Sequence, residues 1–332
     1  MGNVAVFVPH VGCPNQCSFC DQRAITGGAQ APAPQQVWDT ARSAAVHLGD
    51  RVKETEIAFF GGSFTAIPRE QMVSLLAPAK EAVERFGFRG LRCSTRPDAV
   101  DREVLSLLKA YHMAAVELGA QSMDSQVLEL NLRGHTPEDT VRAAGLIREA
   151  GLELGVQMMT GLYGSTSEKD LKTAKALIAL GPDTARIYPT VVLEGTPLAE
   201  LYRRGLYRPQ TVEEAVDLCA QLLPLFEEAG VRVIRLGLHA EKDVERRRIA
   251  GAYHPALREL AESRLFLSRL LPELEKLPRG RYQVKVRPRE LSIAIGQRRA
   301  NVRALEDRGY QVGFVPGEEA PPGGFLIKMP GM

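Results

Sequence analysis

Three cysteines lie within eight residues near the N-terminus. Cys13, Cys17 and Cys20 form the segment C-P-N-Q-C-S-F-C. Three thiolates on one loop can hold three irons of a cubane [4Fe–4S] cluster, which leaves the fourth iron without a protein ligand. That open iron can chelate the amino and carboxylate groups of S-adenosylmethionine (SAM), and electron transfer can then break the C–S bond. The spacing therefore predicts a site that generates a 5′-deoxyadenosyl radical.

A structural zinc site is the alternative for these cysteines, with Cys93 or His10 as the fourth ligand. Zinc ligands more often come as two spaced pairs, which favours the iron–sulfur cluster. Phe19, the aromatic residue before the last cysteine, is then expected to cover the adenine of SAM. Cys-x3-Cys-x2-Cys with an aromatic residue in this place resembles the signature of the radical SAM superfamily.

Short apolar strands alternate with helical-period segments along most of the chain, which predicts a parallel sheet with helical crossovers. Six such units in about 190 residues favour an α/β fold built as a partial (β/α)6 TIM-type barrel, with a small α/β appendage at the C-terminus. A further strand is expected at 231–236. The six predicted barrel strands are Val4–Val8, Glu56–Phe60, Leu91–Ser94, Ala114–Leu118, Leu154–Met159 and Ala185–Tyr188.

Polar or glycine-rich turns follow the first four strands, where a barrel places its chemistry. Gly61, Gly62 and Ser63 stand where the radical SAM superfamily carries a motif that receives the methionine amino group of SAM. Thr95 and Gln121, after the third and fourth strands, offer polar groups for a ribose or a carboxylate. Ordinary turn and capping roles are the alternative for all of these residues.

The mouth of the sixth strand offers two candidate catalytic groups. Tyr188 and Glu194 could donate hydrogen or orient a substrate, with an ordinary role at the strand end as the alternative.

Three longer segments resemble the radical SAM domain of the catalytic Elongator subunit, which modifies the wobble uridine of tRNA. They are C-S-T-R-P-D (93–98), V-E-L-G-A-Q-S-M-D-S-Q-V-L-E-L-N-L-R-G-H-T (116–136) and R-I-Y-P-T-V-V-L-E-G-T-P-L (186–198). The resemblance implies cluster ligation by the three cysteines, SAM contacts at Gly61–Ser63 and a nucleoside beside Gln121. It implies a tRNA substrate. The cysteine spacing differs from that of Elongator, and the chain leaves no room for its acetyltransferase domain, so acetyl-CoA chemistry is not implied.

The segment 278–332 is basic, with ten Lys and Arg against five Asp and Glu, whereas the rest of the chain has a net charge of −3. Strands are expected at 282–286 and 310–315, with helical structure over Leu291–Leu305. The run E-L-S-I-A-I-G-Q-R-R-A-N-V-R is similar to part of the KH repeats of the transcription factor NusA. KH domains present a G-x-x-G loop to nucleotide phosphates; here Arg299 replaces the second glycine. Arg298 and Arg299 are the predicted RNA contacts, and a basic cap that closes the barrel is the alternative.

Composition narrows the class of protein further. Of the 332 residues, 45% are hydrophobic and 25% charged, which excludes global disorder. No apolar run approaches the ~18 residues of a membrane span, and no secretory leader is visible, so we expect a cytoplasmic protein without a membrane partner. The expected organisation is a radical SAM barrel over residues 1–240, a helical extension over 241–277 and a KH-like or capping module over 278–332.

The predicted function is radical modification of an RNA nucleoside in tRNA, with a flavodoxin or ferredoxin as electron donor. Two alternatives remain: a radical SAM enzyme acting on a protein or small molecule, and a non-catalytic RNA-binding iron–sulfur protein. The modified atom, the transferred group, the fate of SAM and the oligomeric state are not encoded in any pattern of the sequence.

Overall fold

The computed structural model describes residues 2–8, 13, 16–20, 32–238 and 242–328. The chain forms two compact units: Met1–Gln210 with Phe226–Ala252, and Thr211–Leu225 with Tyr253–Met332. Each unit has a sheet of its own. The three-part functional division, with boundaries after residues 240 and 277, stays a prediction. Within the described residues, no helix has both the length and the apolarity that a membrane crossing requires.

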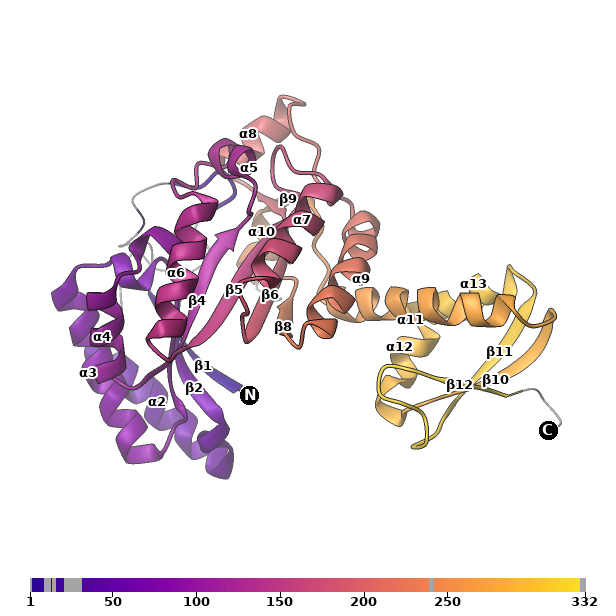
Figure 1. Cartoon of the computed structure of the whole chain (residues 1–332), viewed down its shortest axis with the longest axis horizontal. Helices are drawn as coiled ribbons and strands as arrows, with labels where there is room; N and C mark the ends of the chain where they lie inside the picture. Colours follow the sequence, from indigo (N-terminus) through magenta and orange to yellow (C-terminus); the bar gives the residue numbers. More distant parts are fainter. Residues whose placement is uncertain (1, 9–12, 14–15, 21–31, 239–241, 329–332) are drawn as a thin grey trace. The chain divides into compact units, whose positions relative to one another are not determined.

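The first unit is built on seven parallel strands in the order β1-β2-β3-β4-β5-β6-β8 (Figure 1). The partial barrel predicted from the sequence is confirmed, and the strand expected at 231–236 joins its edge as a seventh strand beside β6. The strands are β1 (Gly2–Val8), β2 (Thr55–Gly61), β3 (Gly90–Thr95), β4 (Met113–Gln121), β5 (Glu153–Thr160), β6 (Thr184–Pro189) and β8 (Arg232–Leu236).

Helices connect consecutive strands of this sheet, and Figure 1 shows α6 and α7 lying along β4 and β5. Their starts follow from local chemistry: the Asp101 carboxylate caps α4 by accepting from Val104 N at 2.7 Å. Thr136 and Asp139 form a capping box at the start of α6. The helices are α2 (Pro34–Leu48), α3 (Arg69–Phe86), α4 (Arg102–Ala110), α5 (Ser125–Leu130), α6 (Pro137–Glu149), α7 (Ser167–Ile178), α8 (Pro197–Arg203) and α10 (Lys242–Arg247). A short antiparallel pair, β7 (Val191–Leu193) with β9 (Arg248–Gly251), completes the unit.

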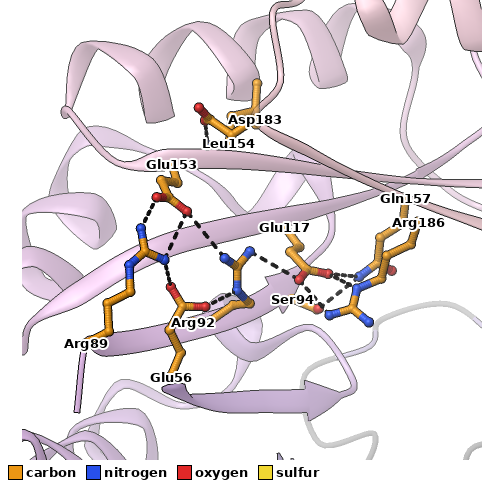
Figure 2. Close-up of polar contacts among 10 residues, drawn as sticks. All are labelled: Glu56, Arg89, Arg92, Ser94, Glu117, Glu153, Leu154, Gln157, Asp183 and Arg186. Carbon is orange, nitrogen blue, oxygen red and sulfur yellow. Dashed lines mark hydrogen bonds and ion pairs between the residues drawn. The ribbon is translucent and has the colours of Figure 1, made fainter. Parts of the chain in front are cut away.

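A chain of buried ion pairs runs across one face of the first sheet (Figure 2). Arg92 Nε donates to Glu56 at 2.5 Å, and Arg92 Nη1 lies 3.3 Å from Glu117. Glu117 also accepts two hydrogen bonds from Arg186, at 2.6 and 2.9 Å. Burial acts to raise the pKa of Glu117, but its contacts with Arg186, Arg92 and Gln157 outweigh this and hold the pKa below its usual range. Glu117 therefore stays charged, and the ion pairs of this chain link neighbouring strands to one another.

The second unit places helices against a three-stranded sheet of order β11-β10-β12. β10 pairs parallel with β11 and antiparallel with β12. Its apolar core includes Phe266, Leu270 and Leu274 of α11, packed against Val284 and other strand residues. The elements are α9 (Val212–Glu228), of which residues 212–225 belong to this unit, α11 (Leu257–Glu275), β10 (Gly280–Val286), α12 (Leu291–Ile295), α13 (Ala300–Glu306), β11 (Tyr310–Pro316) and β12 (Leu326–Lys328).

The helical structure expected over Leu291–Leu305 is interrupted, which corrects the prediction of one continuous helical segment. α12 ends before Gly296, whose φ of 76° is outside the helical region. Arg298 and Arg299 then adopt left-handed conformations, with φ of 51° and 61°, before α13 begins. The apolar period continues across this break because both short helices face the same core, so periodicity alone could not reveal it.

Candidate active site

The carboxyl ends of the parallel strands bring the predicted cofactor-binding segments to one edge of the first sheet. Cys13, in the segment that follows β1, has its Sγ 3.8 Å from Ser63 Oγ in the turn after β2. The backbone passes closest at Gly61, whose φ is 118°, because a Cβ there would lie 2.5 Å from Val8 O. Gly62 N donates to the same carbonyl at 2.8 Å. The glycines therefore allow the close approach of the two turns.

Cys17 is buried, and a residue far along the chain contacts its sulfur. Arg133 Nη1 donates to Cys17 Sγ at 3.1 Å, while Nη2 donates to Gly119 O at 2.5 Å. This arginine was not among the residues predicted for the site. It lies inside the N-L-R-G-H-T run that resembles Elongator. The sequence therefore marked this run as distinctive but gave no indication that Arg133 contacts Cys17.

Asn131 ties the cysteine segment to the end of α5. Its side-chain oxygen accepts from Ser18 Oγ at 2.7 Å, and its backbone carbonyl accepts from Ser18 N at 3.1 Å. The amide nitrogen of Asn131 donates to Val127 O and Tyr163 O. Because Asn131 is fully buried and every one of these groups has a partner, Ser18 is held between Cys17 and Phe19 in a fixed position.

A second arginine adds positive charge beside the cysteines. Arg96 makes two hydrogen bonds to Asp98, at 2.6 and 2.9 Å, and donates to Arg133 O at 2.8 Å. Burial acts to lower the pKa of Arg96, but Asp98 and the nearby thiols of Cys17 and Cys13 raise it overall. Arg96 therefore stays protonated next to the position where thiolates would gather.

Two buried polar atoms near Cys17 lack a hydrogen-bond partner within the described part of the chain, namely Gln121 Oε1 and Arg133 Nε. Both side chains converge on Gly119: a Cβ there would lie 3.1 Å from Gln121 Nε2 and 3.6 Å from Arg133 Nη2. Gln121 itself adopts a left-handed φ of 65°, a costly conformation for this residue type. Buried polar atoms without a partner are uncommon, so Gln121 Oε1 and Arg133 Nε are candidates for contact with a polar ligand.

Thr95 and Phe19 make contacts within the protein. Thr95 Oγ1 lies 2.6 Å from Thr65 Oγ1, so its hydroxyl already has a partner. The half-buried Phe19 ring packs against an apolar cluster that includes Leu198 and Tyr207. The Arg133 guanidinium carbon lies 6.0 Å from the Phe19 ring centre. Phe19 therefore stands beside Arg133, which contacts Cys17, and its place over the adenine of SAM stays a prediction.

The two predicted catalytic residues have different surroundings. Tyr188 is directed toward Arg186, and burial raises the pKa of its phenol. Arg186 in turn lies over the Phe60 ring, at 4.9 Å from the ring centre. Glu194 is about half exposed and forms an ion pair with Arg203. Only Tyr188 thus adjoins the buried polar network of the sheet.

The surroundings of Cys93 do not favour a metal-binding thiolate. It is fully buried, and burial raises its thiol pKa strongly. The residues described by the structure include no group of three or more His, Cys, Asp or Glu side chains arranged to hold a metal ion, and His10 lies outside these residues. Cys13, Cys17 and Cys20 are among the described residues, so the structure does not gather their three thiols around one point. Residue type and spacing make these thiols the donors that suit an iron–sulfur cluster, and Arg133 and Arg96 lie close to Cys17.

Two family models match the chain. The Radical SAM superfamily matches residues 7–177, and the Radical_SAM C-terminal domain matches residues 182–266. Because the first match covers more than half of the chain, the protein belongs to the Radical SAM superfamily. Members of this superfamily use a [4Fe–4S] cluster and SAM, so both predicted cofactors are confirmed and the zinc alternative is set aside.

Within the superfamily, the chain is similar to Elongator-type proteins, as the sequence resemblance predicted. It is 38% identical over 191 residues to the tRNA uridine(34) acetyltransferase of Methanocaldococcus jannaschii, which covers 52% of this chain and 35% of that protein. It is 28% identical over 239 residues to Elongator complex protein 3 of Homo sapiens, covering 66% of this chain and 43% of that protein. The chain thus spans less than half the length of these two relatives.

A solved structure shares the fold. The archaeal Elp3 of Methanocaldococcus infernus, with an N-terminal deletion, superimposes with a TM-score of 0.62 at 23% identity. The match covers 84% of this chain and 64% of that one. A likeness at this level of identity shows a shared fold alone.

Proposed function

We propose that this radical SAM enzyme modifies a nucleoside of tRNA in the cytoplasm, with a flavodoxin or ferredoxin as electron donor. The observation that carries the proposal is the match of 52% of the chain to a protein named tRNA uridine(34) acetyltransferase. When bound, the cluster and SAM supply a radical that can abstract hydrogen from an unactivated C–H bond. The transferred group does not follow from the relatives, because the chain spans 35% of the first of them.

The residues of the chain have separate tasks in this proposal. Cys13, Cys17 and Cys20 hold the cluster, and Gly61, Gly62 and Ser63 receive the methionine end of SAM. Thr95 and Gln121 line the site at the ends of β3 and β4; the buried, unsatisfied Oε1 of Gln121 supports its contact with a ligand. Phe19 covers the adenine, beside Cys17. Tyr188 is the candidate group for orienting the substrate, and Glu194 is the second.

A basic loop in the second unit supports an RNA substrate. Gly296–Arg299 joins α12 to α13, and the side chains of Arg298 and Arg299 are exposed. In the described part of the chain, no ion pair involves either arginine. Unneutralised guanidinium groups bind phosphates and release counterions from RNA, which gives salt-dependent affinity. We assign this loop to contact with the tRNA backbone.

The loop is held in shape from beneath. The buried Asn301 amide donates to Ala294 O and Ser263 O, both at 3.1 Å, and to Ile293 O at 3.3 Å. Left-handed φ values at two consecutive arginines cost on the order of 1 kcal/mol each, and such a conformation persists when the surroundings impose it. Arg299 thus takes a left-handed conformation at the position where a KH loop has its second glycine.

The test of the proposed function is nucleoside analysis of tRNA. We expect a strain without this gene to lose one modified nucleoside, detected by mass spectrometry of digested total tRNA, and a plasmid copy to restore it. A plasmid carrying Cys17→Ala is the matched control and should not restore it. An unchanged nucleoside profile would refute the RNA substrate. Formation of 5′-deoxyadenosine by the anaerobically reconstituted protein, together with that result, would favour a protein or small-molecule substrate instead.

A further inference from the structure

Hydrogen bonds within the protein fix both the backbone and the side chain of Arg133. Its backbone N donates to Leu128 O at 3.0 Å, and its backbone carbonyl accepts from Arg96 Nη2 at 2.8 Å. The side chain is buried, and Nη2 is anchored on Gly119 O. The preceding residue, Leu132, adopts a left-handed φ of 55°. Its side chain is 52% exposed, so burial of this side chain does not account for the strain. The protein thus maintains a strained turn whose effect is to aim Arg133 at Cys17.

The contact with Cys17 has a chemical consequence once the sulfur is a cluster ligand. The thiol loses its proton on binding iron, so Arg133 Nη1 becomes a cationic donor to a thiolate, at the 3.1 Å separation already present. One-electron reduction adds a negative charge to the cluster. A fixed positive charge and a hydrogen bond to a ligating sulfur stabilise that reduced state, and such contacts are among the main determinants of cluster reduction potential.

We propose that Arg133 is a positioning residue that donates a hydrogen bond to the Cys17 thiolate and thereby raises the reduction potential of the cluster. The inference rests on the cofactor of the superfamily and not on the tRNA substrate, so either can fail without the other. Asn131 complements Arg133, because it fixes Ser18, the neighbour of Cys17, through two hydrogen bonds. The segment Asn131–Arg133 thereby affects both the position of Cys17 and its electrostatic surroundings.

The experiment is a redox titration of the full-length, anaerobically reconstituted enzyme without SAM, with the reduced cluster followed by EPR. In Arg133→Gln, we expect the ratio of reduced to oxidised cluster at a fixed potential to fall about tenfold, which corresponds to ~59 mV for one electron. Arg133→Lys keeps the charge but not the fork of donors, so its shift should be smaller. Arg102→Gln, at an exposed arginine paired with Glu149, is the control and should match the wild type.

A midpoint potential of Arg133→Gln equal to that of the wild type, at equal iron content, would overturn the proposal. So would a weaker affinity for SAM with an unchanged SAM-free potential, because Arg133 would then act on SAM and not on the thiolate. A variant that fails to retain iron does not decide the matter, so a second measurement uses the wild type. With ¹⁵N-labelled arginine, pulsed EPR of the reduced cluster should show a guanidinium nitrogen coupling, and its absence would equally refute the contact.

Discussion

Arginine is used in opposite ways in the two units of the molecule. In the first unit, Arg92, Arg133 and Arg186 are buried, and each has acceptors within hydrogen-bond distance: carboxylates, a carbonyl or a cysteine sulfur. In the second unit, Arg298 and Arg299 are exposed on a strained loop, and no described carboxylate pairs with them. A buried, partnered cation fixes local geometry and potential, whereas an exposed cation without an acidic partner is available to a polyanion.

The proposed function follows this contrast, with the chemistry expected in the first unit and RNA binding expected in the second. The charges of Arg92 and Arg186 are neutralised at short range by buried carboxylates, so these two arginines should contribute little to attracting tRNA. Substitutions in one region should therefore leave the property of the other intact, and each prediction below tests that separation.

The largest effect is expected at Cys17. Cys17→Ala removes a cluster ligand, so iron and 5′-deoxyadenosine formation should fall to background, while tRNA affinity at fixed salt stays close to that of the wild type. The measurements are iron analysis, chromatography of SAM products and filter binding. Cys93→Ala is the matched control: it removes a buried thiol outside the site and should retain the cluster. Loss of iron from Cys93→Ala would mean that Cys93 is a metal ligand after all.

The next effect separates buried from exposed ion pairs within the first unit. Glu117→Gln removes the carboxylate that pairs with the buried Arg186 and one of those that pair with Arg92, and it should lower the free energy of unfolding by about 3–5 kcal/mol. Glu194→Gln breaks an exposed pair with Arg203 and should cost less than about 1 kcal/mol. Urea unfolding of both variants provides the comparison. Equal losses of unfolding free energy in the two variants would show that Glu117 does not stabilise the sheet more than an exposed ion pair does. A stable Glu194→Gln variant that no longer forms product would identify Glu194 as catalytic.

The fold was predictable because its determinants are local. Apolar strands alternating with helices identified the parallel barrel class and every strand of the large sheet, and Asp101 marked the start of α4 as observed. The adjacency of Cys13 and Ser63 also followed, since both lie in turns after neighbouring parallel strands. The break at Gly296–Arg299 was missed, because two short helices that share one core face preserve the period of a single helix.

The supporting residues of the site were not predictable in the same way. Arg133 lies 116 residues from Cys17, and Asn131 lies 113 residues from Ser18. Neither has a residue type or spacing that indicates a thiol or hydroxyl partner, and the contacts exist only because α5 returns over the cysteine segment. The resemblance to Elongator marked the N-L-R-G-H-T run as distinctive but gave no account of its task, which the geometry supplies.

The smallest effect, and the direct test of the second region, concerns the salt dependence of tRNA binding. Replacing both Arg298 and Arg299 by alanine should weaken affinity about tenfold near 0.1 M salt and reduce the slope of log K against log salt by roughly 1.4–1.8, the contribution of two phosphate contacts. Arg289→Ala, at an exposed arginine 3.7 Å from Glu290, is the control and should change the slope little. SAM cleavage without RNA should be the same in all three proteins. If the double variant keeps the wild-type slope, the loop does not contact phosphates, and the basic segment is a structural cap whose exposed charges are neutral to binding.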